Sequence, residues 1–162
     1  MERLAALLTR ERLLAELVVF KLVEMRQLLL AGEARFLPWA AEEVERATGA
    51  LREIELQRAL LVVEIAHDRG MADAEPPLQA LVDEAPEPRR TVLAEAADAL
   101  RDLCREAEDH VAANRALAEQ GVSAVSELLG RAARPADDGL VLYGPDATVR
   151  TGVPAARVAQ RL

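Results

Sequence analysis

Residues 89–129 read RRTVLAEAADALRDLCREAEDHVAANRALAEQGVSAVSELL, and this stretch decides the fold class. Small and aliphatic side chains recur in it every three or four residues, which is the spacing of one face of an α-helix. The members of this face are Leu93, Ala96, Leu100, Leu103, Ala107, Asn114, Leu117, Ala124 and Leu128. The pattern predicts one long amphipathic helix that carries a polar residue, Asn114, on its apolar face.

Two earlier stretches, residues 2–31 and 37–66, show the same periodicity of leucine, valine and alanine. Glu11 and Lys21 lie on the apolar face of the first stretch, and we expect their stems to cover apolar surface while their charged heads stay in water. The stretch at 89–129 is longer than the other two. Because apolar faces of unequal length cannot cover one another completely, we expect a binding function on the uncovered length.

The amino-acid composition favours helices as well. Hydrophobic residues make up 51% of the chain but aromatic residues only 2%, so the core must consist of Leu, Val and Ala. This composition is typical of long packed helices, and it disfavours a β-sandwich, which uses more β-branched and aromatic residues. We predict an all-α protein, an elongated antiparallel bundle of three long helices with coiled-coil-like packing and a flexible C-terminal tail.

The predicted domain organisation is a helical domain at residues 1–133 and a mostly disordered tail at 134–162. The three helices are expected at about 2–31, 38–67 and 88–131. Residues 68–87 are expected to form a connector with one short helical turn, which ends at the prolines 86 and 88. In the tail, an apolar cluster at 140–143 precedes the turn sequence Gly144-Pro145-Asp146, and no sustained period follows.

The net charge of the chain limits the kinds of binding partner that we expect. The formal net charge is −8, which argues against binding to nucleic acid or to an anionic membrane and suits a basic or apolar protein partner. No apolar run is long enough to span a membrane, and we expect a cytoplasmic protein.

The chain has one cysteine, Cys104, so no internal disulfide can form. We expect Cys104 to be a small core residue.

The motifs of catalysis and metal binding are incomplete. A di-iron site in a helical bundle needs two Glu-x-x-His pairs, and only Glu64 with His67 has this spacing, because Ala107 stands at the matching position before His110. No Ser-His-Asp or Cys-His arrangement is supported, and the glycines do not have the spacing of a phosphate loop. We therefore predict no metal, no cofactor and no enzymatic activity, and expect a protein that binds other proteins.

Several segments, taken in their order along the chain, resemble the FlgN-type flagellar export chaperones. The resemblance covers most of residues 1–147. The segments are Leu29-Leu30-Ala31-Gly32, Leu51-Arg52-Glu53-Ile54-Glu55-Leu56-Gln57-Arg58-Ala59, Ala85-Pro86-Glu87-Pro88-Arg89-Arg90-Thr91-Val92-Leu93, Ala113-Asn114-Arg115-Ala116-Leu117 and Tyr143-Gly144-Pro145-Asp146.

The resemblance implies a cytoplasmic chaperone without catalytic activity. Such a chaperone binds the C-terminal helical region of hook-associated (hook–filament junction) proteins, keeps them from assembling prematurely and delivers them to the type III export gate. The C-terminal helix of these chaperones carries the client contacts, and a tyrosine beyond it is tied to docking on the export gate. By position, that tyrosine is Tyr143. Alternatively, the aromatic ring of Tyr143 packs an ordered tail back on the bundle. The family tends to have a glycine four residues after the tyrosine, whereas this chain has Ala147.

The implied client contacts lie in the second half of the longest helix. They are Asn114, Leu117, Val122, Val125, Leu128 and Leu129. The last four have the three-to-four spacing with which an amphipathic helix is recognised in a groove. Alternatively, these residues close the bundle or a homodimer. Asn114 has two interpretations, a polar residue that sets the register of a helix interface or a contact to the backbone of a partner.

Two alternatives to the chaperone function remain at this stage. The first is a generic coiled-coil adaptor or scaffold that homodimerises through its apolar faces. The second is a ferritin-like or other bundle enzyme. We expect the free chaperone to be a monomer or a weak homodimer.

Overall fold

The computed structural model describes residues 1–71 and 76–132 together with the strand residues 141–143 and 149–151. The chain forms two compact units, residues 1–120 and residues 121–162, and each unit is described by itself. The first unit contains three helices and the first three-quarters of a fourth. The second contains the end of that fourth helix and two short strands.

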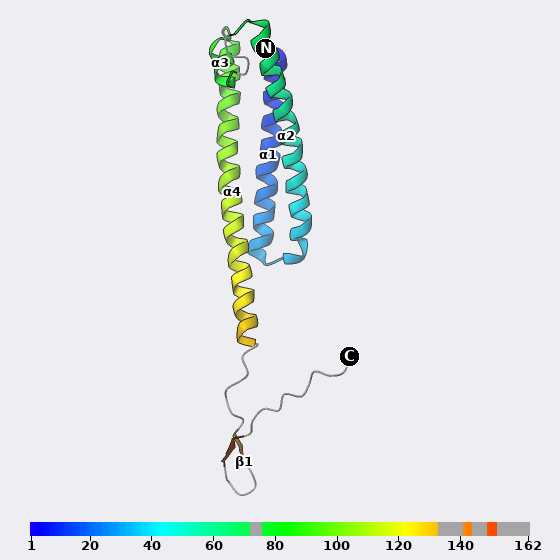
Figure 1. The fold of residues 1–162 in the computed structure, drawn as a ribbon, viewed down its shortest axis with the longest axis vertical. Coiled ribbons are helices and arrows are strands. Elements are labelled where there is room, and N and C mark those ends of the chain that lie inside the picture. Colours follow the sequence, from blue (N-terminus) through cyan, green and yellow to red (C-terminus); the bar gives the residue numbers. More distant parts are fainter. Residues whose placement is uncertain (72–75, 133–140, 144–148, 152–162) are drawn as a thin grey trace. The chain divides into compact units, whose positions relative to one another are not determined.

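The three long helices of the predicted all-α bundle are present (Figure 1). They are α1 (Glu2–Ala31), α2 (Leu37–Asp68) and α4 (Arg89–Ala132). A 3-10 turn, η1 (Ala34–Phe36), precedes α2, and a six-residue helix, α3 (Leu78–Asp83), precedes α4. Since α1 has 30 residues, it is about 45 Å long.

The first helix ends at Ala31, as the sequence predicted, and Gly32 caps it. Gly32 adopts a left-handed conformation with φ of 70°, which glycine reaches without steric cost. The amide of Gly32 donates to the carbonyl of Leu29 at 3.2 Å, and the amide of Glu33 donates to Leu28 at 3.0 Å. This cap turns the chain, and α2 then runs antiparallel to α1 and packs along it (Figure 1).

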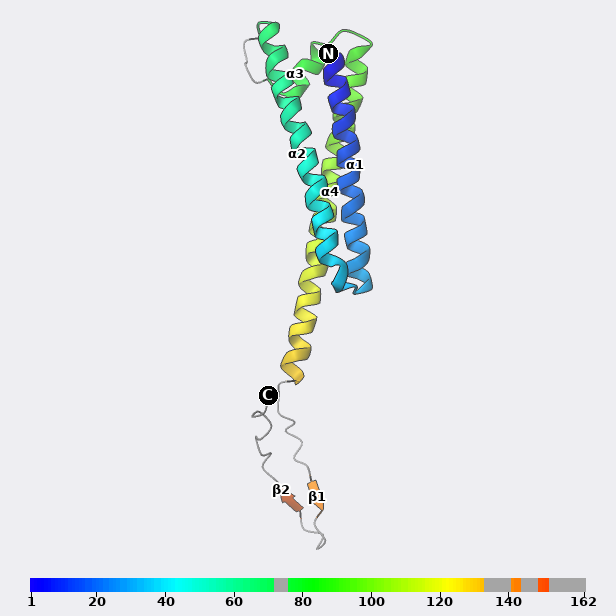
Figure 2. The same cartoon turned by 90° about the vertical axis from the view of Figure 1, so that its right-hand side faces the viewer.

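The main core lies at the end of the bundle where α1 begins. Leu4 and Leu8 of α1 pack there with aliphatic side chains of the other helices, and the shared cluster contains Leu61, Val62, Leu81, Val82, Ala85, Leu93 and Leu100. The short helix α3 lies at this same end (Figures 1 and 2). Because Leu81 and Val82 of α3 are among the most deeply buried residues, the segment expected to be a connector contributes to the core.

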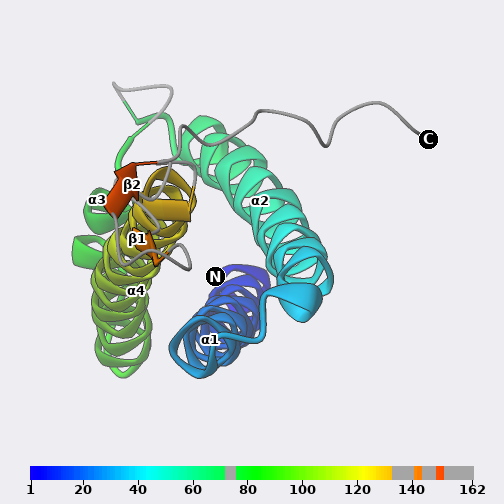
Figure 3. The same cartoon turned by 90° about the horizontal axis from the view of Figure 1, so that it is seen from below.

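Within the first unit the three long helices are unevenly spaced. Seen along the bundle, α1 lies between α2 and α4 (Figure 3). A second, smaller core cluster of Val18, Leu22 and Ala47 joins α1 to α2, and Ala107 of α4 packs against it. The helices α1 and α2 approach each other more closely than either approaches α4. The side of the first unit between α2 and α4 is therefore the least closed.

The two charged residues on the apolar face of α1 behave differently. Glu11 is buried, and one of its carboxylate oxygens accepts a hydrogen bond from Nε of Arg58 on α2 at 2.7 Å. The expectation that its head stays in water is therefore wrong, because α2 supplies a charged partner directly opposite. Lys21 is half-buried, and its ammonium group pairs with Glu24 and with Glu43 on α2, at 2.7 and 2.8 Å. The bonds to Glu24 and Glu43 raise the pKa of Lys21.

The second unit contains a short strand pair that the sequence analysis did not expect. Strands β1 (Val141–Tyr143) and β2 (Val149–Thr151) are antiparallel, with Leu142 opposite Arg150 and Tyr143 opposite Val149. Val, Tyr and Thr favour extended backbone, which accounts for this pairing. The expectation of disorder concerns residues 134–140, 144–148 and 152–162 as well, and these lie outside the described residues.

Candidate protein-binding surfaces

The end of α4 exposes large aliphatic side chains at helical spacing. Four predicted client contacts are involved, and their exposed fractions are 68% for Val122, 57% for Val125, 63% for Leu128 and 65% for Leu129. Leu117, which precedes them on α4, is half-buried. An exposed Leu or Val by itself is ordinary, but a row of four on one short helical segment is typical of a protein-binding surface.

Asn114 lies in a different environment from these four residues. Its side chain is 5% exposed, and its Nδ2 donates to the backbone carbonyl of Leu22 on α1 at 2.9 Å. Its Oδ1 is buried without a hydrogen-bond partner among the described residues. This arrangement favours the interpretation of Asn114 as a polar residue that sets the register of α4 against α1, because the bond ties one position of α4 to one position of α1.

Tyr143 is the last residue of β1, and its backbone pairs with Val149. Ala147, which stands four residues later where the family tends to have a glycine, lies outside the described residues. The assignment of Tyr143 to the export gate stays a prediction.

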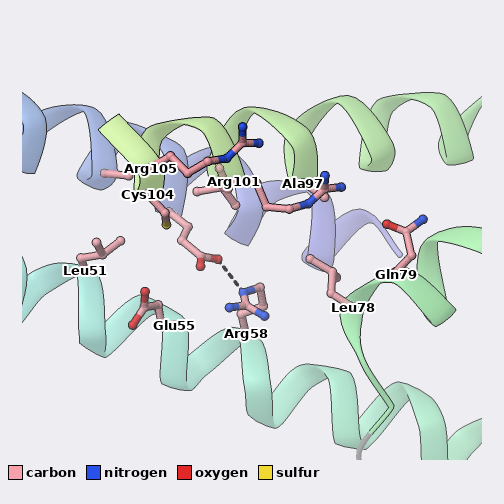
Figure 4. Close-up of a pocket in the computed structure, with 12 residues that line it drawn as sticks. Leu51, Glu55, Arg58, Leu78, Gln79, Ala97, Arg101, Cys104 and Arg105 are labelled. Atoms are coloured by element: carbon pink, nitrogen blue, oxygen red, sulfur yellow. Dashed lines mark hydrogen bonds and ion pairs between the residues drawn. The ribbon is translucent and has the colours of Figure 1, made fainter. Parts of the chain in front are cut away.

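A groove runs between α2 and α4 in the first unit, and α1 forms its floor. Its volume is about 470 Å³. Apolar side chains from all four helices of this unit line it, including Ala15 and Leu100. Leu51 and Leu78 are two more of them (Figure 4). The buried pair of Glu11 and Arg58 crosses the floor. The groove is thus apolar at its base, and the charges at its base neutralise each other.

The walls of the groove carry charges of opposite sign. Glu55 extends from α2, whereas Arg101 and Arg105 lie along α4 (Figure 4). Each arginine pairs with an aspartate one turn earlier on α4, Arg101 with Asp98 and Arg105 with Asp102. These pairs are exposed to solvent, so rearranging them costs little free energy.

Cys104 lines the same groove and is exposed, so the expectation that it is a core residue is wrong. The helical period places Cys104 beside Leu100 on the inner side of α4, but α2 is too distant to cover it. Partial burial raises the pKa of the Cys104 thiol, and the nearby carboxylates of Glu55, Glu11 and Glu108 raise it further. The thiol is therefore accessible but a weak nucleophile near neutral pH.

The groove was not predictable from the sequence, although the helices that form it were. The α4 residues Ala97, Leu100 and Cys104 follow helical spacing, which signals an inward face. No local signal tells how far α2 stands from that face, since the distance depends on how both helices pack on α1.

Among the described residues, no group of three or more His, Cys, Asp and Glu side chains is placed to hold a metal ion. Over the same ranges, no helix combines the length and the apolar character that crossing a membrane requires.

The fold and these surfaces first define a class: a bundle of long helices that presents aliphatic side chains to solvent in the manner of a protein-binding module. Comparison with protein families then gives the particular family. Residues 1–151 match the family model described as "FlgN protein", and the chain belongs to the FlgN family. This is a family of flagellar export chaperones, and it is not a family of enzymes. No curated protein and no solved structure matches the chain.

Proposed function

We propose that this protein is a cytoplasmic chaperone that binds the C-terminal helical region of flagellar hook-associated proteins, prevents their premature assembly and delivers them to the export gate. The observation that carries the proposal is the row of exposed aliphatic residues at the end of α4. Membership of the FlgN family supports a role in flagellar export, and the row supplies a surface to which an amphipathic client helix can bind.

The proposed client surface in the second unit consists of Val122, Val125, Leu128 and Leu129, and Leu117, in the first unit, stays a predicted client contact. The spacing of the first four residues matches the anchors that a helix presents to a partner helix. Free in solution, these side chains expose apolar area to water. A client helix that covers them removes this area from water, at roughly 25 cal/mol for each Å² buried.

Replacing Val125 and Leu128 by Asp tests the client surface. We expect the double variant to lose capture of a hook-associated protein in a pull-down with purified proteins, and to keep its helicity in far-UV circular dichroism. A matched control replaces Leu56 and Leu60 of α2 by Asp, since these residues are equally exposed, at 61% and 63%. If the α4 variant unfolds, its residues belong to the core; if the control loses capture, the client surface lies on α2.

Sedimentation separates the chaperone from a homodimeric adaptor. We expect the free protein to sediment as a monomer or weak dimer and to form a one-to-one complex when the hook-associated protein is added. A tight dimer that does not respond to the hook-associated protein favours the adaptor.

Tyr143 is proposed as the contact to the export gate. Truncating the chain after Arg134 removes it and should leave the helical bundle folded. We expect the truncated protein to bind its client but to fail in delivery, measured as secretion of the hook-associated protein by flagellated cells. If delivery is retained, Tyr143 is not a docking residue.

A further inference from the structure

The groove between α2 and α4 is a second surface of the molecule, and it lies entirely within the first unit. It is separate in sequence from the exposed row on α4, which begins at Val122. We propose that this groove binds an amphipathic α-helix of the client, with acidic side chains on the flank that faces α4 and basic side chains on the flank that faces α2. This inference rests on the proposed function, because it takes the client as the source of the helix.

The geometry of the groove fits a helix. Two long helices form its walls and a third forms its floor, so a helix placed in it completes a four-helix arrangement (Figure 3). The floor and the α4 wall present small side chains, Ala15 and Ala97, which permit close approach of a helix. Leu78 and Gln79 of α3 line the groove as well, and α3 lies at the end of the bundle where α1 begins (Figure 2).

The base of the groove suits the apolar face of such a helix. Leu51 of α2 is half-buried and supplies an aliphatic contact, while Leu100 of α4, which is 8% exposed, belongs to the apolar base. Glu11 is the one acidic side chain buried at the base, and Arg58 already neutralises it at 2.7 Å. An apolar side chain entering the groove therefore meets no uncompensated charge, which would otherwise penalise its binding.

The rims determine the kind of helix and its orientation. Arg101 and Arg105 are one helical turn apart on the α4 rim, and Glu55 lies on the α2 rim. Both arginines can exchange their exposed aspartate partners for carboxylates of a bound helix at little cost. Charges of opposite sign on the two rims favour one orientation of an amphipathic helix over the reverse, because the reverse places like charges together.

The reactivity of Cys104 reports whether a helix occupies the groove, since Cys104 is the single cysteine of the chain and lines the groove. The experiment measures the rate at which N-ethylmaleimide alkylates the full-length protein at mildly alkaline pH, with and without the purified hook-associated protein. We expect the client to slow alkylation about tenfold, because a bound helix covers the thiol. The control combines Cys104→Ala with Ala116→Cys, which moves the thiol roughly 120° around α4 to another exposed position. Its alkylation should not change.

A charge-reversal pair tests the rim independently of the thiol. Arg105→Glu should weaken client binding about fivefold to tenfold in calorimetry, because it places a negative charge against the acidic flank of the helix. Arg3→Glu is the matched control: Arg3 is likewise exposed and pairs with an acid, Glu64, at 3.4 Å, but it belongs neither to the groove nor to the exposed row on α4. We expect it to bind the client like the unaltered protein.

The outcomes separate this inference from the proposed function. If the client binds but neither protects Cys104 nor responds to Arg105→Glu, the groove is not a client site and the proposed function stands. If the client does not bind at all, both fail. If Cys104 becomes protected as the free protein is concentrated and dimerises, a second copy occupies the groove, and the client-helix proposal is wrong.

Discussion

The two halves of α4 contain the same kinds of residue at the same spacing, but they have opposite environments. In the first unit, Leu93 and Leu100 are buried against α1, α2 and α3. In the second unit, Val125 and Leu128 are more than half exposed. The difference shows that the period of apolar residues predicts which face of a helix turns inward or toward a partner, whereas burial depends on what lies opposite.

The two regions of α4 should contribute differently to the stability of the protein. Residues buried in the first unit should determine its free energy of unfolding, and the exposed residues of α4 should matter for binding and little for folding. The following variants test that division, each with a matched change in the other region.

The largest difference in the free energy of unfolding is expected when a leucine is replaced by alanine in each of the two regions. Leu8→Ala leaves a cavity beside fully buried neighbours and should lower the free energy of unfolding by about 2–5 kcal/mol. Leu128→Ala removes an exposed side chain and should change it by less than about 0.5 kcal/mol. Urea unfolding followed by circular dichroism measures both. Equal losses would mean that the end of α4 is packed against protein in solution.

The next largest difference in stability is expected between breaking an ion pair in the first unit and breaking one in the second. Arg58→Met leaves the Glu11 carboxylate buried without its charged partner, and should destabilise the protein by about 3 kcal/mol. Adding Glu11→Leu should recover much of this loss, because the uncompensated charge disappears. Arg131→Met removes the exposed pair with Glu127 and should have no measurable effect on the urea midpoint. A small effect of Arg58→Met would indicate that water reaches Glu11.

A smaller, stabilising effect is expected from glycine replacement within the helices. Gly49 lies in α2 and Gly130 near the end of α4, and each has open space where a Cβ would be added. Gly49→Ala should raise the free energy of unfolding by about 1 kcal/mol, because it restricts the unfolded chain and favours the helix. Gly130→Ala should leave the thermal midpoint unchanged, because a terminal helical turn opens independently of the bundle. A similar rise for both would show that α4 unfolds with the bundle along its whole length.

The smallest effect concerns the reactivity of the Cys104 thiol in the first unit. Burial and the neighbouring carboxylates, Glu55 first among them, raise its pKa, so less of the reactive thiolate is present at a given pH. Alkylation should therefore be slower than for an unstructured peptide cysteine, and the rate should rise at higher pH. Glu55→Gln should lower the pKa and accelerate the reaction by less than about tenfold. Glu127→Gln, in the second unit, should leave the rate unchanged.

The helices themselves were predictable because their signals are local. The period of Leu, Val and Ala, the glycine at position 32 and the prolines before Arg89 suffice to place helices and their ends. The exposed row at Val122–Leu129 was also predictable in part, since the third helix is longer than its partners. The strand pair at Val141–Tyr143 was not, because three residues are too short for a periodic signal.

The environments of single residues could not be predicted in the same way. Glu11 and Asn114 both break an apolar pattern, and each bonds to a group distant in sequence: Glu11 accepts from Arg58, and Nδ2 of Asn114 donates to the carbonyl of Leu22. Cys104 follows the pattern but is exposed, since α2 does not pack closely against α4. The short helix at Leu78–Asp83 resembles a linker by its proline-rich flanks, and yet it fills the end of the core.

The sequence by itself determined that this protein is helical, which face of each helix is apolar, and which family it belongs to, because these properties follow from local spacing and residue order. The tertiary structure alone decided which apolar residues are covered, which charges are paired and where the groove between α2 and α4 lies. The physical reason is that burial, pairing and cavities depend on distances between helices. Those distances result from the packing of all the side chains at once, and no single segment of the chain specifies them.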